Sequence, residues 1–345
     1  MIDIWAGAKM RKTGVDPIRR RRSRAMLSLS GWLVSGAAAL ALAVPAVAQD
    51  ARRGSPGGPP DDPILPYAAL APVPHGEIRI TWYSSKVFKA QRRLRVYTPP
   101  GYANGRRRYP VLYLMHGGGG DDATWNDSGR AGFILDNLIA AGKAQPMIVV
   151  MPNSGPQDPS ADRYMGNTTP AGLAARRKFA DQVRDDVIAD LTSDIVPQVD
   201  RSYRTLVGRA NRAVAGYSFG GAETIWAATR EMNSFAWFGV FSMGIQGGSA
   251  APSNAIAGSG VAETPAEFMK ANPAFFADPG RTNRAARLIW IGVGKDDGIV
   301  ANGPGQLADT LRSAGIRNDY HLTAGGHAFQ NWRDYLRDFY QRIFR

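Results

Sequence analysis

Short, uninterrupted apolar runs recur along this chain, and segments with helical spacing separate them. The apolar runs cover residues 111–115, 147–151, 213–215, 237–241 and 288–293. Helical spacing of apolar residues is present at 131–141, at 179–199 and from 221 onward. Uninterrupted apolar strands are typical of a parallel sheet that is buried on both faces. Because strands that alternate with helices form such a sheet, we predict an α/β fold with a mostly parallel central sheet and helices on both faces.

Two segments that precede these runs alternate between apolar and polar residues. Residues 78–82 and 94–97 show the period of two that is typical of half-exposed strands. We therefore expect them to form edge strands at the start of the sheet. Residues 247–282 are rich in Gly, Ala, Ser and Pro, and this composition indicates a long excursion above the sheet, a candidate lid.

The amino-terminal segment carries a basic cluster, an apolar stretch and a pair of alanines, in that order. The basic cluster ends at Arg24, the apolar stretch covers 25–44, and Ala46 and Ala48 have the spacing of a signal-peptidase site. This order predicts a secretory signal peptide over residues 1–48 and a periplasmic or secreted mature chain. A transmembrane anchor is the alternative, because the apolar stretch approaches the roughly 20 residues that span a bilayer. The small residues around the site favour cleavage.

The rest of the chain divides into a linker and one domain. Residues 49–73 are rich in Gly, Pro and charged side chains, which predicts a linker, and residues 74–345 are predicted to form the domain. The chain has a formal net charge of +13, but residues 1–48 hold eight Lys or Arg and two Asp, which leaves +7 for the remainder. This modest excess predicts neither a nucleic-acid partner nor stable membrane association after signal cleavage.

The chain contains no cysteine. Disulfides, thiolate metal sites and a cysteine nucleophile are therefore excluded. His, Asp and Glu show no ligand-like spacing such as His-x-x-x-His, so we expect no metal and no other cofactor.

A Gly-x-Ser-x-Gly pentapeptide is the strongest indication of chemistry. Residues 216–220 read Gly-Tyr-Ser-Phe-Gly and lie between the apolar run at 213–215 and the helical stretch from 221 onward. Two glycines at this spacing permit a tight strand-to-helix turn that exposes the serine side chain above the sheet. An ordinary glycine turn is the alternative, but the strand and helix on either side favour a nucleophile, Ser218.

A serine nucleophile needs a general base, and the chain has four histidines. His327 lies in a glycine-rich loop after the last predicted strand, where a triad base is expected. His75 and His321 are expected to have structural roles, and His116 is expected to support the site through hydrogen bonds.

The acid that orients the base is expected after a strand, between the serine and the histidine in sequence. Asp296 and Asp297 both follow the apolar run at 288–293. The spacing leaves both open, and only one of them can be the acid of a triad.

Four consecutive glycines, residues 117–120, follow His116 and the apolar run at 111–115. Such a loop can bring backbone N–H groups close to a bound ester, and the N–H of Phe219 is expected to be a second donor to an oxyanion. A phosphate-binding loop is the alternative. No Lys-Ser or Lys-Thr follows the glycines, which argues against a P-loop.

Motifs of one known family are present at residues 96–102, 109–117, 216–221 and 325–327. They resemble the carbohydrate esterase family of feruloyl and acetyl xylan esterases, within the α/β-hydrolase superfamily. The wider group also contains enterochelin esterases and mycolyltransferases. The order of serine, aspartate and histidine along the chain is that of α/β-hydrolases.

The resemblance implies a role for five residues. It places the nucleophile at Ser218, the acid at Asp297, the base at His327, and the oxyanion donors at Gly118 and Phe219. Many members carry an aliphatic residue at the position of Gly118 and methionine at the position of Phe219. This difference implies an acyl pocket of a different shape.

The expected function is hydrolysis, through an acyl-enzyme, of feruloyl or acetyl esters of plant polysaccharide, with a small-molecule or oligosaccharide ester as substrate. A siderophore-lactone esterase or an acyltransferase would use the same triad. A catalytically silent carbohydrate-binding relative is the remaining alternative, and the intact triad argues against it.

Three aromatic residues are candidates for stacking on a cinnamoyl ring. Trp125 follows the glycine run, and Phe329 and Trp332 follow His327. Flat aromatic side chains in such loops can bind an aromatic acyl group. Packing of the last helix is the competing interpretation for Phe329 and Trp332.

Overall fold

The structure, a computed structural model, describes residues 63–155, 170–245 and 264–345. Eight strands in this part of the chain form one sheet, in the order β1-β2-β4-β3-β5-β6-β7-β8. The strands are β1 (Glu77–Ser85), β2 (Ala90–Thr98), β3 (Val111–Met115), β4 (Ile148–Pro152), β5 (Arg212–Tyr217), β6 (Trp237–Phe241), β7 (Leu288–Gly294) and β8 (Asp319–Thr323). Strands β3 to β8 are mutually parallel, whereas β2 is antiparallel to β1 and β4. The predicted α/β-hydrolase fold is confirmed.

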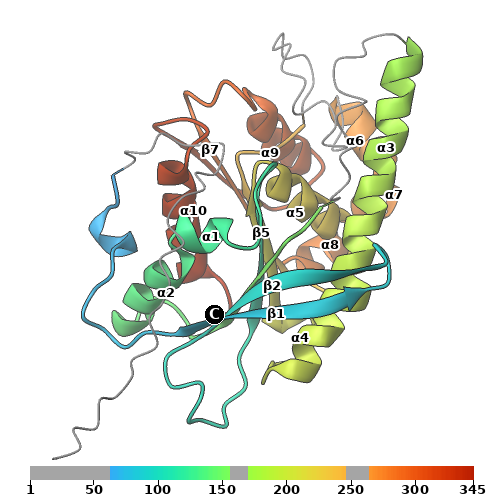
Figure 1. The fold of residues 1–345 in the computed structure, drawn as a ribbon. Coiled ribbons are helices and arrows are strands. Elements are labelled where there is room, and N and C mark those ends of the chain that lie inside the picture. The colour runs from blue at the N-terminus through green and yellow to red at the C-terminus, as the bar shows by residue number, and fades with distance from the viewer. Residues whose placement is uncertain (1–62, 156–169, 246–263) are drawn as a thin grey trace, which may run out of the picture. The chain divides into compact units, whose positions relative to one another are not determined.

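Helices cover both faces of the sheet (Figure 1). The helices on one face are α1 (Thr124–Asp127), α2 (Ala131–Ala140) and α10 (Phe329–Arg342). The helices on the other face are α3 (Pro170–Ala189), α4 (Val196–Ser202), α5 (Phe219–Arg230) and α9 (Gly303–Ser313). In β3, Tyr113 packs in one core and Leu112 in the other, because successive side chains of a strand point to opposite faces. Burial on both faces is therefore the reason for the uninterrupted apolar runs.

The prediction that residues 94–97 form an edge strand is wrong. Strand β2 lies between β1 and β4, so of this pair only β1 is at an edge. The polar residues that create the alternation in β2 are Arg93 and Arg95, and both donate to the fully buried carboxylate of Asp122, at 2.7 and 3.1 Å. The alternation reflects ion pairs with a buried acid, a pattern that periodicity does not separate from exposure to solvent.

The helix predicted at 179–199 is longer than expected and is not uniform. Helix α3 begins at Pro170, a π-helical segment η3 (Asp190–Ile195) follows it, and α4 ends at Ser202. In η3, the Asp190 carboxylate accepts hydrogen bonds from the hydroxyls of Tyr83 and Ser85, both at 2.6 Å. These bonds attach η3 to β1.

The predicted lid lies partly outside the described residues, which omit 246–263. Its remainder forms three short helices, α6 (Pro265–Ala271), α7 (Pro273–Phe276) and α8 (Pro279–Ala285). Phe268 and Phe275 of these helices are buried in the core next to α5 and α9. This part of the segment is therefore integrated into the domain.

The predicted signal peptide, residues 1–48, lies outside the described residues, as does most of the predicted linker. From residue 65 the chain packs on α2, where the Asn137 side chain donates to the carbonyls of Tyr67 and Ala69, at 3.0 and 2.9 Å. Within the ranges that the structure describes, none of the helices combines the length and the apolar character needed to cross a membrane.

Candidate active site

The carboxyl ends of the six parallel strands meet at one edge of the sheet, and the loops at this edge carry the predicted chemistry. Ser218 follows β5, Asp297 follows β7 and His327 follows β8. The glycine run at 117–120 follows β3. Residues that are far apart in sequence thus lie together at the carboxyl ends of the strands.

Backbone hydrogen bonds connect neighbouring loops at this edge. The Ser218 N–H donates to the carbonyl of Phe241, the last residue of β6, at 2.9 Å. The Ser242 N–H donates to the carbonyl of Gly292 in β7 at 2.8 Å. The loops after β5 and β6 are therefore held in register with the strands beside them.

The turn at Ser218 has the geometry of a nucleophile elbow. Ser218 adopts φ 53° and ψ −120°, a conformation that residues other than glycine rarely adopt. A Cβ atom on Gly216 would lie 2.5 Å from the carbonyl oxygen of Gly220, and one on Gly220 would lie 2.4 Å from that of Met115. Both positions therefore require glycine, which is the physical basis of the pentapeptide. Backbone strain of this kind is concentrated at functional sites.

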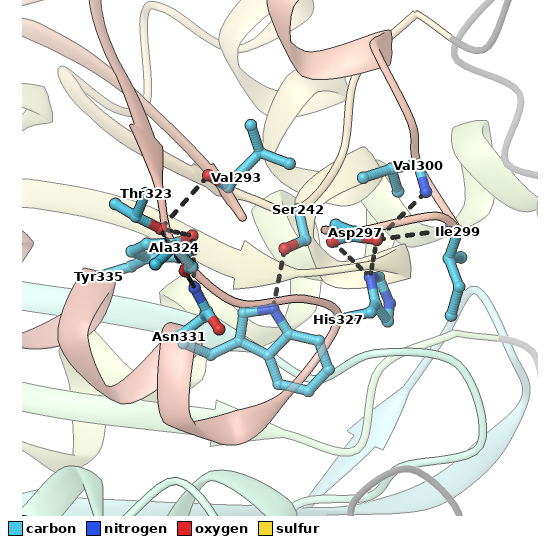
Figure 2. Close-up of polar contacts among 11 residues, drawn as sticks. Ser242, Val293, Asp297, Ile299, Val300, Thr323, Ala324, His327, Asn331 and Tyr335 are labelled. Carbon is cyan, nitrogen blue, oxygen red and sulfur yellow. Dashed lines mark hydrogen bonds and ion pairs between the residues drawn. The ribbon is translucent and has the colours of Figure 1, made fainter. Parts of the chain in front are cut away.

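His327 and Asp297 are in direct contact (Figure 2). The Nδ1 atom of His327 lies 2.9 Å from Oδ2 and 3.1 Å from Oδ1 of Asp297. The carboxylate also accepts hydrogen bonds from the backbone N–H groups of Ile299, at 3.2 Å, and Val300, at 3.3 Å. The Asp297 side chain is completely buried, so these bonds satisfy a charge that water does not reach.

Asp296, the other candidate acid, faces away from the histidine. Its side chain is 61% exposed and pairs with the Lys295 ammonium at 3.2 Å. The Asp297 N–H donates to the carbonyl of Gly294 at 3.1 Å, so the two aspartates belong to one tight turn, in which one side chain is exposed and the other is buried. The position after the strand leaves both aspartates open, whereas the family resemblance indicates Asp297.

Trp332 packs against three parts of the site. Its ring stacks on Tyr217 with centroids 3.9 Å apart and contacts the His327 ring edge to face at 5.0 Å. Its Nε1–H donates to Ser242 Oγ at 3.0 Å. One buried side chain thus contacts the residue before the nucleophile, the loop after β6 and the proposed base.

The structure does not support the expectation that Trp125, Phe329 and Trp332 stack on a substrate ring. All three are buried in the core between the sheet, α1 and α10. Trp125 is fully buried, and its Nε1–H donates to the carbonyl of Met115 at 2.8 Å. Burial of this kind favours the packing interpretation of these residues over contact with a substrate.

The burial of Trp125 leads to a prediction about stability. Trp125→Ala is expected to lower the free energy of unfolding by about 3–5 kcal/mol, because it leaves a cavity in the core. Trp82 is 58% exposed on β1, so Trp82→Ala is a matched control with an expected change of about 0.5 kcal/mol or less. Urea denaturation measures both. Unchanged stability of the Trp125 variant, together with a selective loss of activity on aromatic esters, would restore the substrate-contact interpretation.

The two predicted oxyanion donors lie at the same edge of the sheet. Phe219 is the first residue of α5, so its N–H has no acceptor within the helix and lies at the positive end of the helix dipole. Gly118 is exposed, and a Cβ atom there would have no neighbour within 4 Å. The position of Gly118 therefore has room for a side chain.

Tyr217 and His116 shape the loop that contains Gly118. A Cβ atom on Gly117 would lie 2.3 Å from the Tyr217 ring, and the Tyr217 hydroxyl hydrogen-bonds with the Gly117 backbone. Burial raises the pKa of Tyr217 to about 12, so this hydroxyl stays protonated. His116 Nδ1–H donates to the carbonyl of Gly117 at 2.8 Å, and burial lowers the pKa of His116, which favours the neutral ring.

The chain is similar to known esterases in sequence. Residues 85–343 match the model of the Esterase family, described as "Putative esterase". The chain is 30% identical over 285 residues to "Endo-1,4-beta-xylanase/feruloyl esterase" of Xylanibacter ruminicola, across 81% of this chain and 33% of that protein. It is 26% identical over 258 residues to "Esterase Rv1288" of Mycobacterium tuberculosis, across 68% of this chain and 52% of that protein. The chain thus spans about a third to a half of the length of these relatives.

Solved structures share the fold at lower identity. The ferulic acid esterase AmCE1/Fae1A of Anaeromyces mucronatus has a TM-score of 0.62 and 21% identity, across 81% of this chain and 94% of that one. The enterobactin esterase FES of Shigella flexneri has a TM-score of 0.51 and 17% identity, across 78% of this chain and 60% of that one. The family model matches most of the chain and includes the turn at Ser218 and the loop of His327. The chain therefore belongs to this esterase family.

Proposed function

We propose that this protein is a carboxylic ester hydrolase in which Ser218 is the nucleophile, His327 the general base and Asp297 the acid that orients it. The observation that carries the proposal is the contact of His327 Nδ1 with the buried Asp297 carboxylate at 2.9 Å, at the edge of the sheet where Ser218 forms its strained turn. With Nδ1 bound to the carboxylate, Nε2 remains to exchange a proton with the serine. Membership of an esterase family supports the same activity.

In the proposed reaction, Ser218 Oγ attacks the ester carbonyl while His327 Nε2 accepts the hydroxyl proton. The N–H groups of Gly118 and Phe219 donate to the oxyanion of the tetrahedral intermediate. His327 then gives the proton to the leaving alcohol, and the acyl group remains on Ser218. In the second half, His327 takes a proton from a water molecule that attacks the acyl carbon, the bond from that carbon to Ser218 Oγ breaks, and His327 returns the proton to Ser218 as the acid leaves. The Asp297 carboxylate stabilises the imidazolium that forms in each half.

We further propose that the acyl group is feruloyl or acetyl and that the alcohol belongs to a plant polysaccharide or a fragment of one. The relative with 30% identity is named "Endo-1,4-beta-xylanase/feruloyl esterase" and is matched over 33% of its length, whereas the likeness to the enterobactin esterase is confined to the fold. Ile299, two residues after the proposed acid, is 41% exposed and offers an apolar surface to an uncharged acyl group. A substrate of this kind fits a periplasmic or secreted mature chain, which the predicted signal peptide over residues 1–48 supports.

A substrate panel tests this proposal. The mature protein is expected to react with a fluorophosphonate probe at Ser218 and to hydrolyse methyl ferulate or acetylated xylan with kcat/KM of about 10⁴ M⁻¹s⁻¹ or more. Enterobactin serves as the comparison substrate, and peptide mapping locates the label. Preference for enterobactin would assign the triad to a lactone esterase instead. A chain that neither reacts with the probe nor cleaves any ester would contradict the enzyme assignment.

A further inference from the structure

A carboxylic acid lies buried one helical turn after the proposed nucleophile. Glu223 of α5 is 1% exposed, and it follows Phe219 by four residues, so both side chains lie on the same face of the helix. Its Oε2 accepts a hydrogen bond from Ser154 Oγ at 3.0 Å. Its Oε1 has no hydrogen-bond partner among the described residues. The proposed reaction does not use this group.

The partner serine belongs to the loop that follows β4, at the same edge of the sheet. Arg92 of β2 is buried, and its Nη2 donates to the carbonyls of Asn153 and, at 2.7 Å, Gly155. A Cβ atom on Gly155 would lie 3.8 Å from the Phe219 ring and 3.9 Å from Glu223 Oε1. The backbone of this loop therefore packs directly on the first turn of α5.

The same loop extends toward the glycine run. The Asn153 side chain interacts with His116, and His116 donates to the carbonyl of Gly117 at 2.8 Å. The loop after β4 thus contacts the first turn of α5 at Phe219 and, through Asn153 and His116, is linked to Gly117, the neighbour of Gly118. Glu223 is the side chain of α5 that hydrogen-bonds to this loop.

We propose that Glu223 is a positioning residue, which joins the first turn of α5 to the loop after β4 and so holds Phe219 and Gly118 in place. The role rests on the proposed esterase activity and concerns the same site. Oxyanion donors stabilise the transition state only when they point at the developing charge, so a loosened contact lowers kcat more than it changes KM.

The surroundings of the carboxyl favour its neutral form. Burial is the main cause that raises the pKa of Glu223, the Ser154 hydrogen bond and the Arg92 guanidinium lower it, and the negative charge of Asp190 in η3 raises it, with a net value of about 8. Below pH 8 the group is mostly protonated, and no net charge is buried beside Phe219. Above pH 8 it ionises, and a buried charge draws in water or displaces its neighbours.

Kinetics over a pH range test the proposal. With methyl ferulate, the wild-type kcat is expected to fall about tenfold between pH 7 and pH 9.5, with KM changed less than about twofold. Glu223→Gln keeps the shape and stays neutral, so its kcat at pH 7 should be within about twofold of wild type and should not fall above pH 8. Glu223→Ala should lower kcat about tenfold at pH 7. Glu231→Gln, at the end of the same helix, is the matched control with the wild-type profile.

The pH dependence of stability provides a measurement without substrate. Glu223 binds its proton more tightly in the native protein than in the unfolded chain, where its pKa is near 4.5. The free energy of unfolding is therefore expected to decrease as pH rises from about 4.5 to about 8 and to level off above that. Urea denaturation should show a smaller decrease for Glu223→Gln than for the wild type and for Glu231→Gln.

Three outcomes would overturn the positioning role: the same loss of kcat above pH 8 in wild type and Glu223→Gln, no loss in wild type, or full kcat in Glu223→Ala. If the alanine variant does not fold, the pH dependence of kcat in Glu223→Gln is sufficient to test the role. The rate at which a fluorophosphonate labels Ser218 depends on the oxyanion donors and needs no ester. If the labelling rate differs between wild type and the Glu223 variants although the wild type cleaves none of the tested esters, the proposed substrate is wrong and the positioning role is retained.

Discussion

Replacement of Ser218 by alanine is expected to lower kcat about a million-fold, because loss of the nucleophile in a triad removes most of its catalysis at once. The nucleophile forms the covalent bond to the acyl group, and no neighbouring group replaces its oxygen. The fold should survive, since the partly exposed hydroxyl contributes little to packing. Initial rates with methyl ferulate and thermal unfolding measure the two effects.

Ser234→Ala is the matched control for this experiment. Ser234 lies shortly after α5, and its hydroxyl donates to Glu231 at 3.1 Å, away from the loops of the site. Its kcat should stay within about twofold of wild type. Turnover of the Ser218 variant within a hundredfold of wild type would place the nucleophile on another residue.

Asp297→Asn is expected to lower kcat about 10⁴-fold, the loss seen when the acid of a triad becomes an amide. The amide N–H₂ would face His327 Nδ1 and favour the tautomer with the proton on Nε2. Nε2 could then no longer accept the proton of Ser218. The amide oxygen can still accept the N–H groups of Ile299 and Val300, so the turn after β7 should remain folded.

Asp296→Asn is the matched control, one residue earlier in the same turn. Its carboxylate is largely exposed and pairs with Lys295 at the surface, where an ion pair contributes about 0–1 kcal/mol. We expect kcat within about twofold of wild type. Measurement of kcat/KM for both variants compares the two losses. A larger loss in Asp296→Asn than in Asp297→Asn would identify Asp296 as the acid.

The three aromatic candidates for stacking on a substrate show the limit of reasoning from position in the sequence. Trp125, Phe329 and Trp332 are close in sequence to the glycine run or to His327, which suggested contact with substrate. Proximity along the chain does not determine the direction of a side chain. All three point into the core, where Trp332 stacks on Tyr217 at 3.9 Å and supports the His327 ring.

Glu223 is a residue that reasoning from sequence missed. It lies in an apolar helix face directly after the Gly-x-Ser-x-Gly pentapeptide, and a charged residue among apolar ones was the available signal. Its partner Ser154 is 69 residues earlier in the chain. Only the packing of α5 on the loop after β4 reveals the contact.

The sequence by itself determined the parallel arrangement of the buried strands, the glycine turn at Ser218 and the glycine-rich loop of His327, but not the place of β2 in the sheet or the helices α6 to α8. These features follow from local physics: the period of apolar residues selects the element, and the close backbone approach at Gly216 and Gly220 requires glycine. The resemblance indicates Asp297 and His327 as a pair, but only the tertiary structure gives their contact and the burial of Trp332 against the His327 ring. Such contacts join segments that are distant in the chain, 30 residues apart for Asp297 and His327 and 90 for Ser242 and Trp332. Side-chain direction at these positions depends on how the sheet brings the loops together, and no local pattern encodes it.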